Sequence, residues 1–406
     1  MASRTAPSRR PAASPQRHLR VVRPDEPSGY LKYGRAGEVA RPTDRAVGML
    51  ILATGALVLV GIAMVLSASS VSAYDRFGSS FLFFNRQVAY AAVGAIAALV
   101  MVRIGYRAWK RLAGPALIAT FGLLLLVLVP GVGRVAGGSA RWLAFGPVTV
   151  QPSELAKLVM VAWAAALLSN RIKKIHEPRM LAKPLVLVSL VVCGAILLQP
   201  DMGTAVVVLA SIFVVAFAAG ARLTHLAVAG MTTLVAGMAA IYMEGYRWTR
   251  FISALDPWAD PQGGGYQTIQ SLIGLGSGGL FGVGLGAGRQ KWLYVPNAHT
   301  DFIYSILGEE LGLLGALAVL VLFGVLLYAG TRIALGAPDA FGRLLAAGIT
   351  GWIGLQAAIN LGAVTGLLPI TGVPLPFVSF GGSSLVVSLA AVGVLVSIGR
   401  ARPVRR

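Results

Sequence analysis

Long apolar runs recur along the chain from residue 46 almost to its end, separated by shorter polar segments. Each run is long enough to cross a hydrocarbon core of about 30 Å as an α-helix. The pattern therefore predicts an all-α polytopic membrane protein with ten transmembrane helices. These helices are expected at residues 46–68, 87–102, 113–130, 152–169, 184–199, 203–220, 224–243, 302–329, 344–366 and 383–399.

Composition agrees with this pattern and excludes an ordinary soluble domain. Hydrophobic residues make up 56% of the 406 residues and charged residues only 12%, whereas about 25% of a typical soluble protein is charged. The mean hydropathy is +0.75. The single cysteine, Cys193, lies inside an apolar run, so neither a disulfide framework nor a zinc-ligand spacing is present.

The two ends of the chain differ from this apolar middle. Residues 1–45 contain no apolar run, so we expect no cleavable signal peptide and expect the first helix to direct insertion. Their Pro, Ser and Arg content predicts a disordered basic tail that lies near anionic lipid. The expected organisation is a cytoplasmic tail at 1–45, a transmembrane domain at 46–400 and a short cytoplasmic tail at 401–406.

Basic residues set the orientation of the predicted helices. The formal net charge is +20, a balance that is also typical of nucleic-acid-binding proteins. An even number of helices puts both termini on one side, and if that side is cytoplasmic it holds 26 of the 35 Lys and Arg residues, against eight outside. This excess follows the positive-inside rule. The charge therefore orients the protein in the cytoplasmic membrane, and we expect no nucleic-acid partner.

The longest segment on the outer side, residues 245–300, far exceeds an ordinary connection between helices. It combines a glycine-rich apolar middle with aromatic residues, which favour a membrane interface. The aromatic residues are Trp248, Phe251, Trp258, Tyr266, Trp292 and Tyr294. We expect short or re-entrant helices here at the outer membrane face, and we expect this loop to be the main functional region.

Few ionisable residues lie within or beside the apolar runs, where such residues are costly and usually functional. They are Glu154, Lys157, Asp201, Asp301, Glu309 and Glu310. Glu154 and Lys157 are three residues apart on one helix face, so they either form an internal ion pair or line a polar cavity near the outer face. Asp201 lies at a tight turn, where it either caps the next helix or has a functional role.

Asp301 stands at the start of the eighth predicted helix, where helix capping again competes with a chemical role. Four polar residues precede it closely on the side where basic residues are scarce, namely Arg289, Lys291, His299 and Thr300. Cations kept there against the positive-inside bias indicate an anionic ligand. Glu309 and Glu310 follow on the same helix and either support this site or pair with a basic residue elsewhere.

Two further patterns do not indicate sites. Residues 274–279 match G-x-G-x-x-G, but no strand and helix of a dinucleotide-binding unit surround them. Glycines at 274, 278, 282 and 286 instead repeat every four residues, which predicts a small-residue stripe for close helix packing. The other histidines fall on the cytoplasmic side, so no metal site made only of protein ligands is expected around His299.

Several motifs, in this order along the chain, resemble the SEDS family, named for shape, elongation, division and sporulation. They are Gly138-Ser139-Ala140-Arg141-Trp142, Gln151-Pro152-Ser153-Glu154-Leu155-Ala156-Lys157, Gln199-Pro200-Asp201-Met202-Gly203-Thr204, Asn297-Ala298-His299-Thr300-Asp301-Phe302, Gly308-Glu309-Glu310-Leu311-Gly312 and the run from Leu368 to Ser384. The resemblance covers about residues 46–400 and includes ten helices. Two positions depart from the usual pattern: Asn297, where an acidic residue is common, and Phe380, where a tyrosine is common.

The resemblance implies a peptidoglycan glycosyltransferase that polymerises lipid II on the outer face of the bacterial cytoplasmic membrane. Its implied partners are a class B penicillin-binding transpeptidase, other divisome membrane proteins and membrane lipids. The basic tail and the sequences at 298–301 and 368–372 resemble the division branch of the family more than the elongation branch. This resemblance implies that the protein acts at the division septum. The resemblance also implies that Asp301 is the general base and that Arg141 and Lys157 belong to the site.

This activity fits the residues. The sugar of lipid II is attached to pyrophosphate, a good leaving group, so one base for the acceptor hydroxyl is enough, whereas glycoside hydrolysis uses two carboxylates. The expected pyrophosphate-binding cations are Arg141, Lys157, Arg289 and Lys291, and Glu154, His299 and Thr300 complete the predicted substrate-binding set. The sequence requires no cofactor, and the pyrophosphate is bound with or without Mg²⁺ or Mn²⁺.

Two other functions fit the same features. A lipid II flippase also needs intramembrane charges, although these should line a path that reaches both leaflets. A non-catalytic divisome scaffold would only position the transpeptidase. Charges that gather near the outer face favour the enzyme.

Overall fold

The computed structural model describes residues 44–136, 139–146, 148–172, 178–243, 245–292 and 298–401. Every described residue belongs to one unit of the chain, residues 40–406. Almost all of the predicted tail at 1–45 lies outside the described residues, as do Asn297 and residues 402–406.

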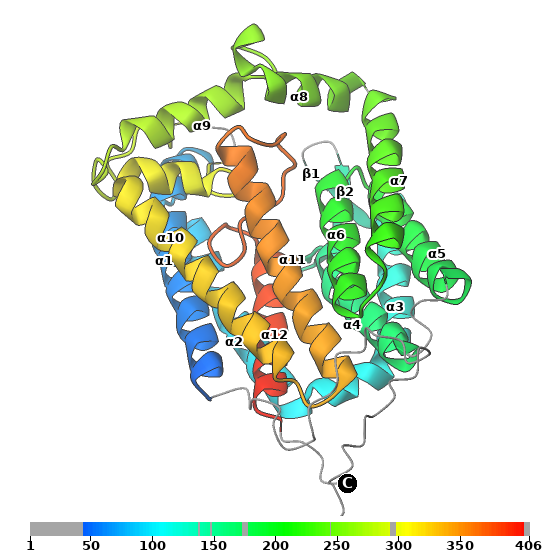
Figure 1. Ribbon diagram of the computed structural model, residues 1–406. Coiled ribbons are helices and arrows are strands. Elements are labelled where there is room, and N and C mark those ends of the chain that lie inside the picture. Colours follow the sequence, from blue (N-terminus) through cyan, green and yellow to red (C-terminus); the bar gives the residue numbers. More distant parts are fainter. Residues whose placement is uncertain are drawn as a thin grey trace, which may run out of the picture. The chain divides into compact units, whose positions relative to one another are not determined.

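Helices make up most of the described chain (Figure 1). They are α1 (Asp44–Phe77), α2 (Leu82–Ile104), α3 (Tyr106–Val127), α4 (Pro152–Asn170), α5 (Pro178–Leu197), α6 (Met202–Ala218), α7 (Leu223–Tyr242), α8 (Gly245–Leu255), α9 (Tyr266–Ser277), α10 (Ile303–Leu335), α11 (Ala340–Val364) and α12 (Gly382–Gly399). Among the described residues, seven of these (α1 to α4 and α10 to α12) are long and apolar enough to cross a membrane, and α5, α6 and α7 contain shorter apolar stretches. Each predicted apolar segment overlaps one helix, so the chain has a polytopic, mainly helical membrane fold.

Local sequence explains where several helices begin. Pro152 occupies the first turn of α4, where its missing N–H removes no helical hydrogen bond. The Asp201 carboxylate caps α6 by accepting a hydrogen bond from the Thr204 N–H at 3.3 Å, and Asp339 caps α11 in the same way. The capping alternative for Asp201 is thus confirmed. The predicted cytoplasmic loop at 103–111 is mostly helical, because α2 and α3 are separated only by Gly105.

The all-α prediction is wrong for the connection between α3 and α4. An antiparallel sheet forms there from β1 (Gly133–Ala136), β2 (Ser139–Phe145) and β3 (Val148–Val150), in the order β1-β2-β3. Leu143 of β2 pairs with Gly133 on one side and Val150 on the other. Strands this short contain no long apolar run, so the hydrophobic pattern did not reveal them.

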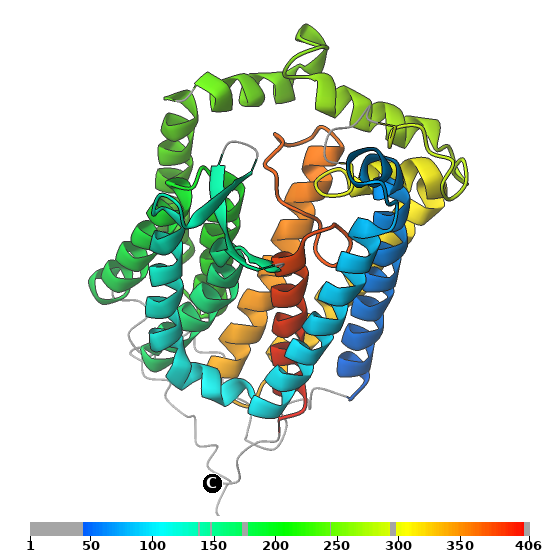
Figure 2. The same ribbon diagram turned by 180° about the vertical axis from the view of Figure 1, so that it is seen from behind.

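The sheet ends beside the start of α12 (Figure 2). The Ser383 hydroxyl accepts a hydrogen bond from the Gln151 N–H at 3.0 Å and donates one to the Thr149 carbonyl at 3.3 Å. The strand β3 and the first turns of α4 and α12 are therefore joined at this point.

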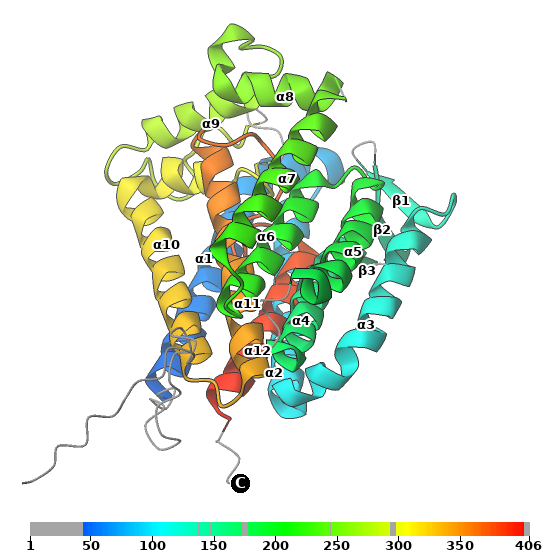
Figure 3. The same cartoon turned by 45° about the vertical axis from the view of Figure 1, so that its right-hand side comes forward.

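Residues 245–300 contain short helices, as expected from the sequence. The helix α7 leads into α8, and α8 and α9 run across the ends of the longer helices (Figures 1 and 3), with the 3₁₀ turn η2 (Pro257–Ala259) between them. Gly274 and Gly278 pack against Ser305 and Gly308 of α10. The four glycines do not form one helical stripe, however, because residues 282 and 286 lie beyond α9 with φ of +81°.

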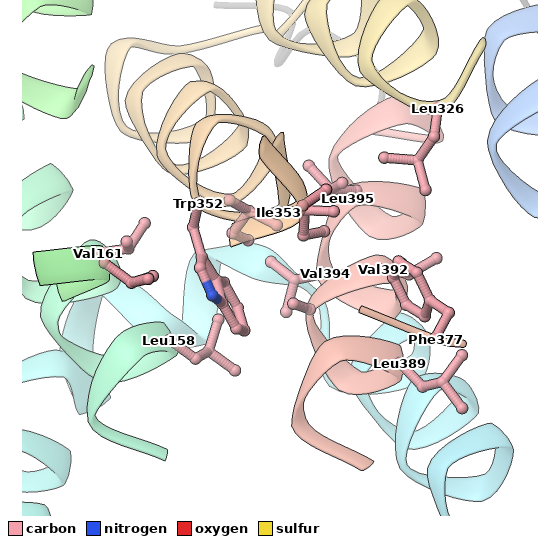
Figure 4. Close-up of a cluster of buried hydrophobic side chains, with 14 of the residues drawn as sticks. Leu158, Val161, Leu326, Trp352, Ile353, Phe377, Leu389, Val392, Val394 and Leu395 are labelled. Atoms are coloured by element: carbon pink, nitrogen blue, oxygen red, sulfur yellow. The ribbon is translucent and has the colours of Figure 1, made fainter. Parts of the chain in front are cut away.

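The core lies between α4, α10, α11 and α12. The Trp352 side chain extends from α11 between Leu158 of α4 and Val394 of α12 (Figure 4), and all three are almost completely buried. At one end of the helices, Val47 of α1, Ile333 of α10 and Gly399 of α12 pack together. We call this the terminal end, and we call the opposite end, where α1 finishes and α12 begins, the site end.

Candidate active site

Asp301 lies at the site end, immediately before α10, and its backbone is firmly held. The carbonyl groups of residues 299, 300 and 301 each accept one hydrogen bond from residues far along the chain. The donors are Phe380 N to His299 O (2.9 Å), Ser379 Oγ to Thr300 O (2.6 Å) and Asn360 Nδ2 to Asp301 O (2.9 Å). These contacts fix Asp301 against α11 and against residues 365–381, which we call the α11–α12 segment.

The groups that hold Asp301 are themselves buried and hydrogen-bonded. The Asn360 amide also donates to the Val373 carbonyl at 2.8 Å, and the Ser379 hydroxyl accepts from the Leu375 N–H at 2.9 Å. Gln87 of α2 donates to the Ser379 carbonyl at 3.2 Å. These hydrogen bonds make a rigid frame, in which Asn360 Oδ1 and Gln87 Oε1 have no partner among the described residues. Sequence reasoning missed Asn360 because it considered only ionisable residues, although an amide in an apolar helix was a visible signal.

The carboxyl group of Asp301 is half-buried and adjoins Gly372. A side-chain carbon at Gly372 would lie 3.8 Å from Asp301 Oδ2, and its φ of +70° favours glycine. Burial raises the pKa of Asp301 to about 6, and Asp201 adds to this effect, whereas Arg250 and Arg141 lower the pKa. Such a carboxylate is mostly ionised at neutral pH and still accepts a proton readily, which suits a general base.

The β2 strand and the starts of α4 and α6 bring Arg141 and Asp201 to this site. Arg141 donates from Nε to the Gln199 carbonyl at 3.1 Å and from Nη2 to the Pro200 carbonyl. Asp201 Oδ2 accepts hydrogen bonds from the Ser153 hydroxyl at 2.9 Å and from the Gln151 amide at 3.1 Å. The structure thus places the predicted Arg141 near Asp301.

Two charged groups near Asp301 were not assigned to the site from the sequence. Asp201 was interpreted chiefly as a cap, and Arg250 was counted only among the outer basic residues. Both act on the pKa of the Asp301 carboxyl. Their sequence separation of 50 residues or more from Asp301 explains why no local pattern connected them.

Glu154 and Lys157 form an internal ion pair. Lys157 Nζ lies 2.7 Å from Glu154 Oε2, and their side chains are only 1% and 3% exposed. The same ammonium donates to Gln356 Oε1 at 2.8 Å and lies over the Trp352 ring. Gln356 in turn donates to the Pro374 carbonyl at 2.9 Å. The ion-pair alternative is therefore confirmed, and the pair supports the α11–α12 segment that holds Asp301; contact with substrate stays a prediction.

The Lys291 ammonium also pairs with a carboxylate inside the protein. Its ammonium lies 3.1 Å from Glu310 Oε1, both side chains are buried, and the Ser67 hydroxyl donates to the Glu310 carboxylate at 2.6 to 2.7 Å. The Glu309 carboxylate accepts from the backbone N–H of Arg289 at 2.7 Å. Of the two alternatives for these glutamates, internal pairing is confirmed for Glu310, and binding of an anionic ligand by Lys291 stays a prediction.

The helix α10 is interrupted soon after these glutamates. Gly312 has φ of +69° and ψ of −168°, which breaks the helical hydrogen bonds. Residues 279–284 replace them: the Val283 N–H donates to the Glu309 carbonyl at 3.0 Å, and the Leu313 N–H donates to the Gly279 carbonyl at 2.9 Å. The first part of α10, which follows Asp301 directly, is thereby anchored on both sides.

The remaining predicted residues have other roles or positions. The His299 ring packs against Phe83 and Phe380, with centroid distances of 4.6 and 5.7 Å. Burial and Arg76 lower the pKa of His299 to about 4, so it is neutral at physiological pH and is not a cation for an anionic ligand. The Arg289 side chain is exposed, and Thr300 contributes its carbonyl to the frame.

A separate question is whether side chains gather to bind a metal ion. Within the described ranges, no group of three or more His, Cys, Asp or Glu side chains is placed to do so.

Known proteins with similar sequences cover almost the whole chain. A family model described as "Cell cycle protein", for FtsW, RodA and SpoVE, matches residues 48–403. Stage V sporulation protein E of Bacillus subtilis strain 168 is 45% identical over 352 residues, which are 87% of this chain and 96% of that protein. The probable peptidoglycan glycosyltransferase FtsW of Geobacter sp. strain M18 is 44% identical over 342 residues, 84% of this chain and 93% of that one.

Solved structures show the same similarity in three dimensions. A chain from a study of how a peptidoglycan synthase complex coordinates polymerization and crosslinking matches with a TM-score of 0.72 and 35% identity, covering 86% of this chain and 96% of that one. The rod shape determining protein RodA of Thermus thermophilus matches with a TM-score of 0.65 and 32% identity, covering 86% and 95%.

Proposed function

Because the chain belongs to the FtsW, RodA and SpoVE family of cell cycle proteins, we propose that it is a peptidoglycan glycosyltransferase that polymerises lipid II during cell division. The observation that carries the mechanism is the state of Asp301. It is a half-buried carboxyl group with a pKa of about 6, in a rigid frame beside two arginines. A proton acceptor for a sugar hydroxyl needs these properties.

Asp301 accepts the proton of the acceptor sugar hydroxyl while that oxygen attacks the anomeric carbon of the donor sugar. The bond between the anomeric carbon and the pyrophosphate oxygen breaks, and the polyprenyl pyrophosphate leaves with its electron pair. Arg141 and Arg250 stabilise the negative charge that develops on the leaving group. No general acid is needed, because pyrophosphate is a good leaving group without a proton.

In this proposal a divalent cation would be bound by the substrate and not by a protein metal site. Mg²⁺ or Mn²⁺ held by the pyrophosphate oxygens would supply further charge neutralisation at the leaving group. Asp201, which already accepts hydrogen bonds from Ser153 and Gln151, is the additional carboxylate near the base.

We infer that ten helices cross the membrane, with both termini in the cytoplasm and the site outside. Two observations support this orientation. The start of α1 and the end of α12 meet at the terminal end, opposite Asp301. The cytoplasmic assignment of that end also gives it 26 of the 35 basic residues. The growing strand would then emerge on the outer side, at the division septum, while the predicted tail at 1–45 lies in the cytoplasm.

The proposed partners follow from the reaction and from one similar structure. That structure belongs to a peptidoglycan synthase complex that joins polymerization to crosslinking. A class B penicillin-binding transpeptidase is therefore the proposed protein partner, together with other divisome membrane proteins. Lipid II, the growing glycan strand and membrane lipids complete the set, and no nucleic acid is involved.

The test is turnover by the purified protein. Fluorescent lipid II is incubated with the protein in detergent, in the absence of any other polymerase, and the products are separated by gel electrophoresis. Glycan strands are expected. Movement of lipid II between the leaflets of proteoliposomes without strand formation would indicate a flippase instead, and the absence of both activities would indicate a scaffold.

A further inference from the structure

A cavity of about 320 Å³ lies beside the candidate active site, between α8, α9 and the α11–α12 segment. Its walls come from three places: Thr249, Arg250 and Ala254 of α8, residues 262–268 around the start of α9, and Ile370. This volume is at the lower end of the range of small-molecule sites, about 300 to 1,000 Å³. It therefore suits a compact group such as a sugar ring, and not a whole disaccharide-peptide.

The wall formed by residues 262–265 is fixed in place by its own contacts. The Asp260 carboxylate accepts hydrogen bonds from the Gly263 N–H at 3.1 Å and from the Gly264 N–H at 2.8 Å. A side chain at Gly264 would collide with the Ser253 hydroxyl of α8, and one at Gly265 would collide with the Pro257 carbonyl. Only a glycine turn can pack so closely against α8, so the cavity is a preformed feature of the fold.

The lining has the chemistry of a saccharide site. Gln262 and Gln267 supply amides that both donate and accept hydrogen bonds, and within the described residues neither side chain has a hydrogen-bond partner. Tyr266 adds an aromatic ring, against which the apolar face of a sugar can pack. Arg250 is the one charged residue among the lining groups. A pyrophosphate site would need more positive charge, so a mainly apolar lining with two amides, an aromatic ring and one charge favours a sugar.

Arg250 and Ile370 connect the cavity with the surroundings of the proposed base. Arg250 lines the cavity and also lowers the pKa of the Asp301 carboxyl, so the two groups lie within electrostatic reach. Ile370 lines the cavity two residues before Gly372, the position that adjoins Asp301 Oδ2. A ring held in the cavity would therefore lie on the side of the site from which Arg250 acts on the Asp301 carboxylate.

We propose that this cavity is the acceptor-sugar subsite: it binds an N-acetylated hexose ring of the acceptor and directs its hydroxyl toward Asp301. This inference rests on the proposed glycosyltransferase function and adds to it the place where the acceptor is recognised. Gln262 and Gln267 bind the ring hydroxyls and the acetamido group, and Tyr266 packs against the ring. The arrangement makes residues 245–268 a substrate-binding element.

The decisive variant is Ala254→Phe, which fills the cavity without touching Asp301. It should raise the KM for lipid II by about tenfold or more, because the subsite no longer admits a ring. The matched control is Ala259→Phe in η2, which is exposed and does not line the cavity, and its KM should stay near that of the wild type. A second variant, Gln267→Ala, removes one amide without adding bulk and should raise the KM by about two- to tenfold.

Binding measurements separate this inference from the proposed function. In the Asp301→Asn background, which still binds substrate but does not turn it over, Ala254→Phe should weaken lipid II binding and Ala259→Phe should not. This readout holds even if the wild type proves to make no strands, a result that would overturn the glycosyltransferase proposal alone. Wild-type affinity and KM in Ala254→Phe would overturn the acceptor-sugar subsite alone.

A peptide-free analogue of lipid II, with the disaccharide on polyprenyl pyrophosphate, tests the chemical class of the ligand. If the cavity binds the sugar, Ala254→Phe and Gln267→Ala should weaken binding of the analogue and of complete lipid II by the same factor. If the variants weaken only the peptide-bearing lipid, the cavity binds the peptide and the sugar assignment is overturned.

Discussion

Glu154 and Asp301 are both carboxylates beside basic residues, yet their surroundings differ in every respect that matters for chemistry. Glu154 is buried and lies 2.7 Å from Lys157, whose ammonium is also bound by Gln356. Asp301 is half-buried and adjoins Gly372, and nearby arginines act on its pKa without fully offsetting its burial. The first carboxylate is paired with a buried ammonium. The second keeps a raised pKa and remains accessible, so it can exchange a proton with a substrate.

This contrast sorts the ionisable residues of the membrane domain into two groups. A desolvated ion pair is retained only when geometry and hydrogen bonds compensate both charges, and removing one partner is then strongly destabilising. The pairs Glu154–Lys157 and Lys291–Glu310 are of this kind. They hold the segments that flank Asp301, so they support the site.

The largest expected effect is that of Asp301→Asn. Asparagine keeps the shape of the side chain and all three backbone carbonyl contacts at 299–301, but it cannot accept the proton. Polymerisation should therefore fall by about 10²- to 10⁴-fold, measured as glycan strands formed from lipid II at equal protein concentration. Near-normal strand formation would remove Asp301 from the role of base.

The same variant has a predicted effect on stability with a definite sign. Burial raises the folded-state pKa of Asp301 to about 6, above its value of about 3.9 in an unfolded chain. The ionised carboxylate thus disfavours the folded state, and this cost develops as the pH rises through about 6. Asp301→Asn should melt at or above the wild-type temperature at pH 8, and the difference should vanish near pH 4. A lower melting temperature at pH 8 would contradict this account.

The next largest effect is expected to be a loss of stability when the buried Glu154–Lys157 pair is broken. Lys157→Met leaves Glu154 charged and without its partner, and breaking such a pair typically costs about 3 to 5 kcal/mol of unfolding free energy. Glu154→Gln strands the ammonium in the same way, whereas the double variant should recover much of the loss. Thermal unfolding in detergent of the four proteins completes a double-mutant cycle. A stable Lys157→Met protein with weak lipid II binding would instead make Lys157 a substrate ligand.

A smaller effect is expected from the frame around Asp301. Ser379→Ala removes the hydrogen bond to the Thr300 carbonyl, which lets the base shift, so kcat should fall by about two- to tenfold while KM changes little. Ser397→Ala is the matched control, because Ser397 is also a buried serine but, within the described part of the chain, bonds only to the Val394 carbonyl of its own helix. Equal kinetics in the two variants would show that the frame does not position Asp301.

The sequence predicted the parts of this molecule that depend on composition or on close spacing. Apolar runs located the helices, and a spacing of three residues was enough to suggest the Glu154–Lys157 pair. The sheet at 133–150 was missed because its strands are short. The pairing of Lys291 with Glu310 was not foreseen, since it depends on the turn at 279–284 and the break at Gly312, which no local pattern reveals.

The site was predicted less completely than the helices, for a physical reason. Asp301 and Arg141 were found because each stands in a distinctive motif. Asn360 and Arg250 reach Asp301 only through tertiary packing, and an isolated polar residue in the sequence does not show what it will contact. The cavity beside Arg250 likewise exists only once α8 and α9 lie against Ile370.

The smallest expected effect is that of Arg250→Gln on the pH dependence of catalysis. It tests whether a nearby arginine sets the pKa of Asp301, in contrast to the ion pair that holds Glu154. Its positive charge lowers the pKa of Asp301 from the value that burial alone would set. In Arg250→Gln that pKa should rise, so the acidic limb of the kcat/KM profile should move to higher pH, by up to about one unit for a partly screened charge. The relative loss of activity should be greater at pH 6 than at pH 8, because only at the lower pH does the extra protonation remove the base. Any weakening of sugar binding or of leaving-group stabilisation would lower the whole profile without moving the limb, so the effect of Arg250 on the pKa is separable from its other roles. Arg134→Gln, which removes an exposed arginine of β1, should leave the limb in place. If both variants keep the wild-type limb, the arginine does not tune the base, and the availability of Asp301 depends on burial alone.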